Sequence, residues 1–323
     1  MKKPFVVAVA MGLATSALFA QTLNVTAPGL IGAKLFDSTP GYTISGMGAG
    51  ATGDIYYLET HGAGASTTLY KRHASSSYTS AQVLFSYGAF VFGSFVVVES
   101  GKVYFGESSR GTVRSVNLDG SGLALIGTVV GNFDMAFSGA GAFVSANPDL
   151  TFANPQNQVV KLDLGTGVTD VILDATPDFS GPLEFDASGA LLYGAAKSSI
   201  GGIYGYSVAA VAGAIGASSI ALTPPANRVV NNGANQFLAF AGGSALWQDD
   251  FSTLRLYDLA TGTGATVAST PHTMGHLDAE GGVLYANVTN FATTRSAVFA
   301  VVPEPSATLL LALGVLAFAR RRK

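Results

Sequence analysis

The amino-acid sequence predicts an all-β protein whose strands form six similar repeats. First, a short block of glycine, apolar residues and an aromatic residue recurs six times along the 323 residues. Second, the chain contains 40 glycines but only 11% charged residues, which is typical of an exported, turn-rich β protein. Third, it contains no cysteine, so disulfides, thiolate catalysis and cysteine-ligated metals are excluded and the fold must rely on a packed core.

Residues 1–20 have the order of a secretory signal peptide. Two lysines precede an apolar run, and small residues lead to Ala20, after which we expect cleavage. The alternative is an N-terminal membrane anchor, but about fourteen apolar residues are too few to span a bilayer comfortably. The mature protein is therefore expected to begin at Gln21.

The recurring blocks define the repeat length, because their first glycines are separated by 48, 40, 48, 54 and 38 residues. The fifth position of the block is aromatic in five of the six repeats. Exposed rings at this position would stack on sugars, but we expect them to fill the gaps between neighbouring repeats. The blocks begin at Gly53, Gly101, Gly141, Gly189, Gly243 and Gly281, and the aromatic residues are Tyr57, Phe105, Tyr193, Trp247 and Tyr285.

Three further strand-like segments accompany each block. Segments of alternating polarity follow it, such as TTLYKR and STLRLYDL, and apolar segments such as AQVLFSYG come next. A fourth segment, such as GSFVVVES, precedes each block. Four short strands in a repeat of roughly 46 residues are the signature of a propeller blade, so the sequence predicts a six-bladed β-propeller. A β-sandwich or a pair of β domains is the alternative.

The sixth repeat lacks an outer strand, because the chain passes from residues 297–301 directly into its tail. Near the N-terminus, GAKLFDSTPGYTISG resembles the TDVILDATPDFSGPLEF segment of the body. Residues 33–38 are therefore expected to form the missing outer strand. We predict that they pair with Ala297–Val301 and close the ring, which removes an edge open to aggregation. The Ala-rich stretch from Val208 to Pro225 explains the longest spacing and is expected to hold a short helix or a loose excursion.

The C-terminal tail carries three features in order: Pro-Glu-Pro, a 14-residue apolar stretch from Ser306 to Ala319, and a basic cluster. The prolines keep the first segment extended. The apolar stretch is short for a spanning helix, and the basic cluster suits a cytoplasmic end. The residues of this motif are Pro303, Glu304, Pro305, Arg320, Arg321, Arg322 and Lys323.

The last 22 residues resemble the PEP-CTERM sorting signal, which is found in Gram-negative bacteria that make exopolysaccharide. The resemblance implies transit to the periplasm with the C-terminal helix in the inner membrane. It also implies cleavage near the Pro-Glu-Pro by an exosortase-type membrane protease, and delivery to the cell surface or matrix. A plain C-terminal anchor is the alternative. The predicted organisation is a signal peptide at 1–20, a propeller at 21–302 and a sorting segment at 303–323.

The charge of the mature body excludes one class of partner. Between Gln21 and Val302 the chain has 11 Lys and Arg against 19 Asp and Glu, a net charge of −8. Without a basic patch, nucleic-acid binding has no electrostatic basis. The sequence also contains no H-E-x-x-H, no G-x-S-x-G and no P-loop, so no motif predicts catalysis or requires a cofactor.

The strands that precede each block would surround a central channel, where polar groups could act on a ligand. The blade count and plan are similar to those of six-bladed lactonases and gluconolactonases, which bind a divalent cation, often Ca²⁺, through Glu, Asn and Asp. The resemblance implies a hard-cation site here that would polarise an ester carbonyl. The polar residues on or beside these strands are Glu99, Asn132, Asp134, Glu184, Asn235, His276 and Asp278, of which Asn132, Glu184, Asn235 and Asp278 are the metal-ligand candidates.

Structural roles are the alternative for these residues, which share no equivalent position when the blocks are aligned. Asp186 and Asp278 align with each other and are typical of turn residues that end a strand. His276 and Asp278 lie on one face of a strand, where a histidine beside a carboxylate can act as a base or ligand, or as a hydrogen-bonded structural residue.

Two function classes are consistent with the sequence. The first is an exported, noncatalytic surface or matrix protein that displays rim loops to exopolysaccharide or to another protein. The second is a secreted, cation-dependent hydrolase similar to the lactonases.

Overall fold

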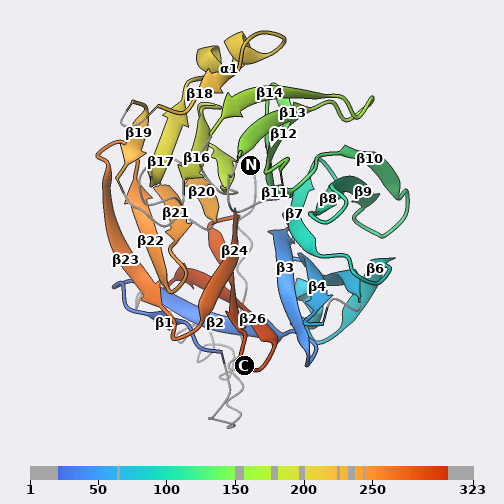
Figure 1. Cartoon of the computed structure of the whole chain (residues 1–323). Coiled ribbons are helices and arrows are strands. Elements are labelled where there is room, and N and C mark those ends of the chain that lie inside the picture. The colour runs from blue at the N-terminus through green and yellow to red at the C-terminus, as the bar shows by residue number, and fades with distance from the viewer. Residues whose placement is uncertain are drawn as a thin grey trace, which may run out of the picture.

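The computed structural model describes residues 21–63, 66–149, 156–175, 181–195, 201–223, 226–231, 237–242 and 245–304. These residues form six sheets around a common centre, so the chain is a six-bladed β-propeller, and the predicted fold class is confirmed (Figure 1). The predicted signal peptide, the apolar sorting stretch and its basic cluster lie outside the described residues.

Each blade contains four antiparallel strands, ordered from the centre of the ring outward, and blades 3 and 5 have a fifth strand at their outer edge. Blade 1 consists of β3 (Tyr42–Ala49), β4 (Ile55–His61), β5 (Thr67–Arg72) and β6 (Ala81–Tyr87), with a short 3-10 turn at Ala74–Ser76. Blade 2 consists of β7 (Gly93–Glu99), β8 (Lys102–Glu107), β9 (Thr112–Asn117) and β10 (Ala124–Thr128).

Blades 3 and 4 are linked by an excursion of the chain. Blade 3 consists of β11 (Asn132–Ser138), β12 (Gly141–Ala146), β13 (Gln158–Leu162), β14 (Thr169–Asp174) and β18 (Ile220–Ala221). Blade 4 consists of β15 (Leu183–Phe185), β16 (Leu191–Ala195), β17 (Gly202–Tyr206) and β19 (Arg228–Val230). The Ala-rich segment after β17 forms the expected short helix, α1 (Val208–Ala214), and then β18, which pairs in parallel with β14 of the preceding blade.

Blades 5 and 6 both receive a strand from the N-terminal segment. Blade 5 consists of β20 (Leu238–Gly242), β21 (Ala245–Asp249), β22 (Thr253–Asp258), β23 (Thr263–Ser269) and β1 (Asn24–Val25). Blade 6 consists of β24 (Thr273–Glu280), β25 (Val283–Asn290), β26 (Arg295–Pro303) and β2 (Leu30–Asp37).

The ring closes as the sequence predicts. In β2, Ala33 lies opposite Ala300 and Asp37 lies opposite Ala297, and Ser38 continues the pairing because its N–H donates to the Ser296 carbonyl at 2.8 Å. The outer strand of the last blade therefore comes from the beginning of the chain. Because β1 pairs with β23, the N-terminal segment also joins blade 5 to blade 6.

The glycine at the start of a block has a conformational role that explains the recurring pattern. Between β7 and β8 only two residues make the turn, and both have positive φ, 48° for Ser100 and 79° for Gly101. Gly281 and Gly282 make the equivalent turn in blade 6, with φ of 60° and 82°. Two consecutive positive φ angles match the twist of a tight hairpin, and glycine adopts them without steric cost.

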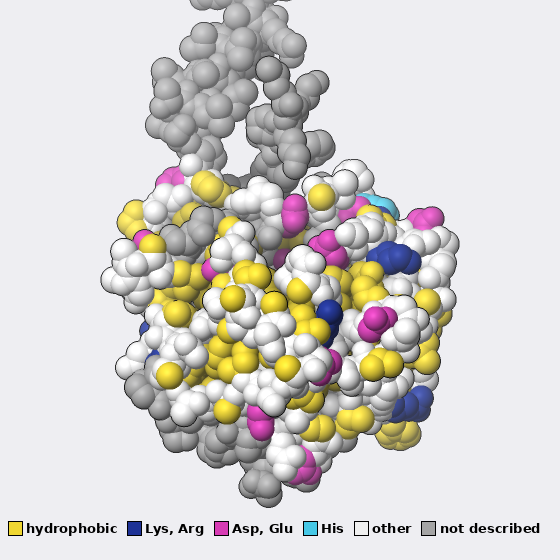
Figure 2. Space-filling model, turned by 90° about the horizontal axis from the view of Figure 1, so that it is seen from above, with side chains coloured by type: hydrophobic (Ala, Val, Ile, Leu, Met, Phe, Trp, Pro, Cys, Tyr) yellow, Lys and Arg dark blue, Asp and Glu magenta, His cyan; other side chains and the backbone are white. Residues whose placement is uncertain are grey.

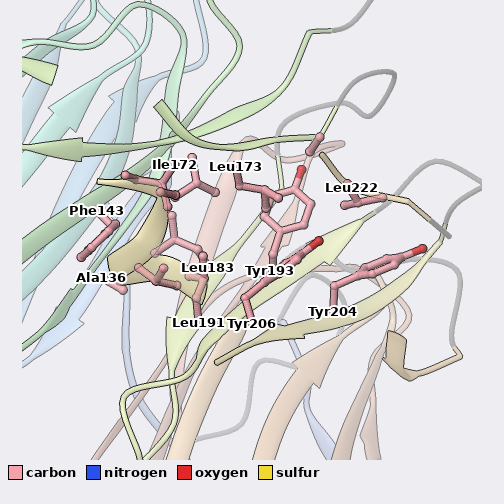
Figure 3. Close-up of a cluster of buried hydrophobic side chains, with 14 of the residues drawn as sticks. Ala136, Phe143, Ile172, Leu173, Leu183, Leu191, Tyr193, Tyr204, Tyr206 and Leu222 are labelled. Carbon is pink, nitrogen blue, oxygen red and sulfur yellow. The ribbon is translucent and has the colours of Figure 1, made fainter. Parts of the chain in front are cut away.

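The core consists of side chains packed between neighbouring blades. The aromatic residues at the fifth block position are buried, with Tyr193 fully so and Trp247 at 7% exposure, and they line no open surface, so the prediction that they pack the core is confirmed. Figure 3 shows one such cluster, which joins Phe143 of blade 3 to Leu183 and Tyr193 of blade 4 and also includes Leu222 from the excursion. Burying an aromatic side chain of this size contributes about 2–3 kcal/mol.

Candidate functional site: the central cavity

A cavity of about 170 Å³ lies at the centre of the ring, and every blade contributes to its wall. The lining comes from the innermost strands and the residues beside them, because those strands have no partner on the channel side. Each blade contributes at least one lining residue; examples from blades 1 to 6, in order, are Met47, Val96, Asp134, Leu183, Leu238 and Leu277.

Four carboxylates line this cavity: Asp134, Glu184 and Asp278 each also bind backbone N–H groups, whereas Glu99 accepts from the Ser100 hydroxyl at 2.6 Å. Asp134 accepts hydrogen bonds from the Met135 N–H at 2.9 Å and from the Leu183 N–H of the next blade at 3.0 Å. Asp278 accepts from the Ala49 N–H at 2.6 Å, which connects blade 6 to blade 1. Because backbone groups on the channel side of an innermost strand have no sheet partner, these carboxylates satisfy donors that would otherwise be buried unpaired.

The third carboxylate, Glu184, follows the same rule. Its Oε1 accepts from the Phe185 N–H at 2.8 Å, and it also bonds to the backbone of Phe240 in blade 5. The three carboxylates therefore connect blade 3 to 4, blade 4 to 5, and blade 6 to 1.

The protonation of these groups is governed by burial. Burial raises the pKa of Glu184 to about 8, and repulsion from Asp134 and Asp278 raises it further. The hydrogen bonds from the backbone of Phe185 and Phe240 oppose this rise. Burial likewise raises the pKa of Asp134 to about 7 and that of Asp278 to about 6. The cavity therefore holds three carboxyl groups that change charge between mildly acidic and mildly alkaline pH.

Aromatic rings from three blades stack beside the carboxylates. The ring of Phe237 lies 5.2 Å from that of Phe133 and 3.9 Å from the imidazole of His276, measured between centroids. Phe133 and His276 both sit at β-bulges, where the register of the inner strand shifts, and a bulge turns an extra side chain toward the centre. Burial lowers the pKa of His276 to about 3, although a hydrogen bond with the Ser45 backbone opposes this, so the imidazole is neutral.

The metal-ligand candidates predicted from the sequence have different fates. Glu184 and Asp278 line the cavity together. Asn132 is buried, and its side chain is engaged within the protein: Nδ2 donates to the carbonyls of Glu107 and Val129 at 2.9 and 3.0 Å, and Oδ1 accepts from the Ser94 hydroxyl. Asn235 lies outside the described residues. Within the described ranges, no three His, Asp or Glu side chains are grouped closely enough to hold a metal ion.

The alignment of Asp186 with Asp278 is wrong. Asp278 lies inside β24 opposite Tyr285, whereas the residue opposite Tyr193 in blade 4 is Leu183, and Asp186 lies in the following turn. The residue that does match Asp278 is Asp134, which lies opposite Ser145 at the same block position. The error arises because the turn after the inner strand spans residues 186–190 in blade 4 but only 281–282 in blade 6, and counting from the glycine ignores this difference.

The sequence interpretation also missed a repeated polar position. The seventh residue from the block glycine is Glu59, Glu107, Asn147, Asp249 and Asn287 in five of the six repeats. Glu107 shows its role, since its carboxylate accepts from the N–H groups of Arg110 and Thr112 at 2.8 and 3.0 Å and so organises the loop that follows β8. Counting two positions beyond the aromatic residue would have found this signal.

The sorting residues begin inside the folded body. Pro303 is the last residue of β26 and lies opposite Leu30, and the Glu304 N–H donates to the Gly29 carbonyl at 2.7 Å. The strand thus extends one residue past the predicted body boundary. Pro305, Arg320, Arg321 and Arg322 lie outside the described residues. No helix in the part of the chain that the structure describes has the length and hydropathy needed to cross a bilayer.

The fold and the tail together define a six-bladed propeller with a C-terminal sorting signal. Residues 301–323 match the family model of the PEP-CTERM protein-sorting motif, which confirms the identification made from the tail. The motif implies export, processing by an exosortase, and a location at the cell surface or outside the cell.

Solved structures resemble the body in fold alone. A gluconolactonase from Xanthomonas campestris is 13% identical, with 87% of this chain and 94% of that chain covered and a TM-score of 0.62. A chain of a nidogen/laminin complex is 12% identical, with 80% and 98% covered and a TM-score of 0.56. An inactive variant of virginiamycin B lyase from Staphylococcus aureus, bound to quinupristin, is 8% identical, with 85% and 99% covered and a TM-score of 0.50. No curated protein matches the chain in sequence.

Proposed function

We propose that this protein is a noncatalytic propeller scaffold of the cell surface or extracellular matrix, which binds polysaccharide or another protein and is sorted through its C-terminal motif. The observation that carries the proposal is the junction of body and tail. The last propeller strand ends at Pro303, so the sorting segment follows a completed ring with no further domain between them.

The buried carboxylates support a scaffold role as well. Asp134 uses both oxygens to bind backbone N–H groups, one of them in the next blade, so its geometry already has a structural purpose. In this proposal the channel stabilises the ring, and binding takes place on the loops.

Cell fractionation and intact mass of the protein in a host that carries an exosortase test this proposal. The wild-type chain should appear at the surface or in the medium without the mass of its tail. A triple variant, Pro303→Ala, Glu304→Ala and Pro305→Ala, should stay with the inner membrane at full mass. Surface delivery of the triple variant in processed form would contradict the sorting role of these residues.

A second candidate function is a cation-dependent, lactonase-like hydrolase, favoured because Asp134, Glu184 and Asp278 line one cavity; these described side chains would have to move closer together to share an ion. Oxygen ligands of this kind suit Ca²⁺. Thermal unfolding with Ca²⁺ and then with a chelator tests it, because an ion that binds the folded state alone stabilises it by about 2.7 kcal/mol at a hundredfold excess over Kd. An unchanged Tm at millimolar Ca²⁺ would remove this candidate, and a reversible rise would justify a screen of lactones.

A further inference from the structure

Exposed phenylalanine side chains gather on one rim of the ring. We define the upper rim as the loops that join the second strand of each blade to the third and each blade to the next. Among the described residues, the phenylalanines with strongly exposed side chains all lie on these loops: Phe90 at 74% exposure, Phe291 at 68%, and Phe92 and Phe251 at 48% each. We call these four residues the aromatic rim.

Hydrogen bonds between loops confirm that these segments share one side of the ring. The Ser108 N–H donates to the Phe92 carbonyl at 3.1 Å, which joins the loop before blade 2 to the loop after β8. The Met274 N–H donates to the Phe251 carbonyl at 2.5 Å, which joins blade 5 to the start of blade 6. The aromatic rim therefore follows the consecutive blades 5, 6, 1 and 2.

Two of the four phenylalanines have an unfavourable backbone conformation. Phe90 has φ of 60° and Phe251 has φ of 71°, both in the left-handed region that bulky residues rarely occupy. Burial offsets little of this strain, because Phe90 is 74% exposed and Phe251 is 48% exposed. A strained residue that stability does not explain points to a function.

The loops hold these side chains rigidly outward. Val91, between Phe90 and Phe92, is fully buried and its carbonyl accepts from the Thr67 hydroxyl, so its two neighbours point away from the core. Phe291 lies in a turn that is ordered by the Asn290 side chain, which accepts from the Ala292 N–H at 3.0 Å. A rigid display of this kind lowers the entropy that binding must overcome.

The chemistry around the aromatic rim is neutral. In the upper-rim loops that the structure describes, the charged residues are Arg110, Asp149 and Asp250, and Asp250 is paired with Arg255 at 3.2 Å. The other residues of these loops are mainly Gly, Ala, Ser, Thr and Pro. The loops of the opposite rim carry Asp54, Asp119, Asp163 and Asp186 and no Lys or Arg in their described part.

The whole body is acidic, and carboxylates are spread over the side of the ring seen in Figure 2. Anionic lipids and acidic polymers would meet repulsion there. The upper rim, with phenyl rings and hydroxyl groups but few charges, complements an uncharged polyhydroxylated chain, whose C–H faces pack on aromatic rings.

The place where the chain leaves the ring orients this surface. The turn that contains Phe291 lies at the upper end of β26, and Pro303 and Glu304 lie at its lower end. The sorting segment therefore departs from the rim opposite the four phenylalanines. While the tail is held in the inner membrane, the aromatic rim faces away from that membrane.

We propose that the aromatic rim is a binding surface for a neutral polysaccharide, whose pyranose rings stack on Phe90, Phe92, Phe251 and Phe291. This inference rests on the proposed scaffold function and names its ligand class and its surface. Phe251, Phe291 and the Phe90–Phe92 pair provide three contact points along an arc of the rim, which suits a chain of sugars better than a single sugar.

Affinity electrophoresis of residues 21–304, which contain every strand of all six blades, tests the proposal with laminarin, a neutral β-glucan, and dextran as neutral probes. Alginate serves as the acidic probe. We expect a neutral probe to retard the wild type. The triple variant Phe90→Ala, Phe251→Ala and Phe291→Ala should bind at least tenfold more weakly. The matched control Leu123→Ala with Val168→Ala removes exposed apolar side chains from the opposite rim and should bind as the wild type does.

Two further variants separate binding from folding. Phe90→Gly and Phe251→Gly relieve the positive φ, so we expect a Tm that is unchanged or higher together with weaker binding. Phe251→Trp keeps a stacking ring and should retain binding, with a blue shift of its fluorescence when laminarin is added.

Several results would overturn the proposal. These are undiminished neutral-glycan binding by the triple variant, preferential binding of the wild type to alginate or to phosphatidylcholine vesicles, and a wild-type dimer that the triple variant abolishes. If the triple variant still binds the host matrix as the wild type does, the aromatic rim is the wrong surface and the scaffold function stands. If the wild type binds neither neutral nor acidic glycan nor any host surface component, the scaffold function fails as well.

Discussion

Glu184→Gln should remove much of the pH dependence of stability in this propeller. Burial raises the pKa of Glu184 from 4.5 to about 8 in the folded state. The folded protein therefore retains a proton that the unfolded chain releases as the pH rises. Stability is full below about pH 4.5, falls as the pH rises toward 8, and changes no further from this group above that value.

The size of the effect follows from the pKa shift. Between pH 5 and pH 8 the folded protein keeps the proton of Glu184 while the unfolded chain has released it. Over these three pH units the free energy of unfolding falls by about 4 kcal/mol, at 1.36 kcal/mol per unit. The carboxylate is partly exposed to the cavity, and water there screens its charge, so we expect about 2 kcal/mol. For a protein of this size that lowers Tm by about 4–8 °C.

Thermal unfolding of residues 21–304, followed by circular dichroism at pH 5, 6, 7 and 8, measures the slope of Tm against pH. The wild type should lose Tm steadily with rising pH, and Glu184→Gln should lose clearly less. Asp119→Asn is the control: hydrogen bonds from Ser121 lower the pKa of this exposed turn carboxylate, so it stays charged throughout the range and its removal should leave the slope unchanged. If Tm falls with pH by the same amount in the wild type and in Glu184→Gln, the reasoning is refuted, because Glu184 then titrates normally in the fold.

Three other perturbations have definite expected outcomes. Deleting residues 21–37 removes the outer strand of blade 6 and should leave no cooperative thermal transition, whereas deleting residues 21–29 removes β1 alone and should only lower Tm. Asn132→Ala should destabilise the fold by about 2 kcal/mol in urea titrations, because three buried partners lose their hydrogen bonds; a change under 0.5 kcal/mol would contradict this. Gly111→Ala should lower Tm more than Gly101→Ala does: both have positive φ, but the new methyl group at 111 would meet the Val129 carbonyl at 2.8 Å and at 101 it meets nothing within 4 Å.

The sequence predicts the fold well because the same physical requirements recur in every blade. A tight hairpin needs glycine at positions such as Gly101, and a sheet that packs on its neighbours needs an aromatic residue such as Phe105 at a fixed distance from it. The missing strand of the last blade is equally predictable, because β26 has an edge that only a similar strand can cover.

The candidate site is less predictable, because it depends on features that a repeat alignment does not contain. Bulges in the inner strands bring Phe133 and His276 toward Phe237, and no spacing in the sequence reveals them. The equivalence of Asp134 and Asp278 is hidden because the hairpin continues two residue pairs further beyond Asp134 than beyond Asp278. The exposure of Phe251 is a property of one loop, and a single phenylalanine between Asp250 and Ser252 carries no periodic signal.

The closure of the ring by β2 and β26 has a consequence for the synthesis and export of the chain. The strand that completes blade 6 is synthesised early, at residues 30–37, and its partner β26 is synthesised much later, where the body meets the sorting motif. A chain that is truncated anywhere before β26 can neither close the ring nor carry the sorting tag. Because the sorting motif follows the strand that closes the ring, only a chain that has been synthesised to its end carries both a complete propeller and the signal for export.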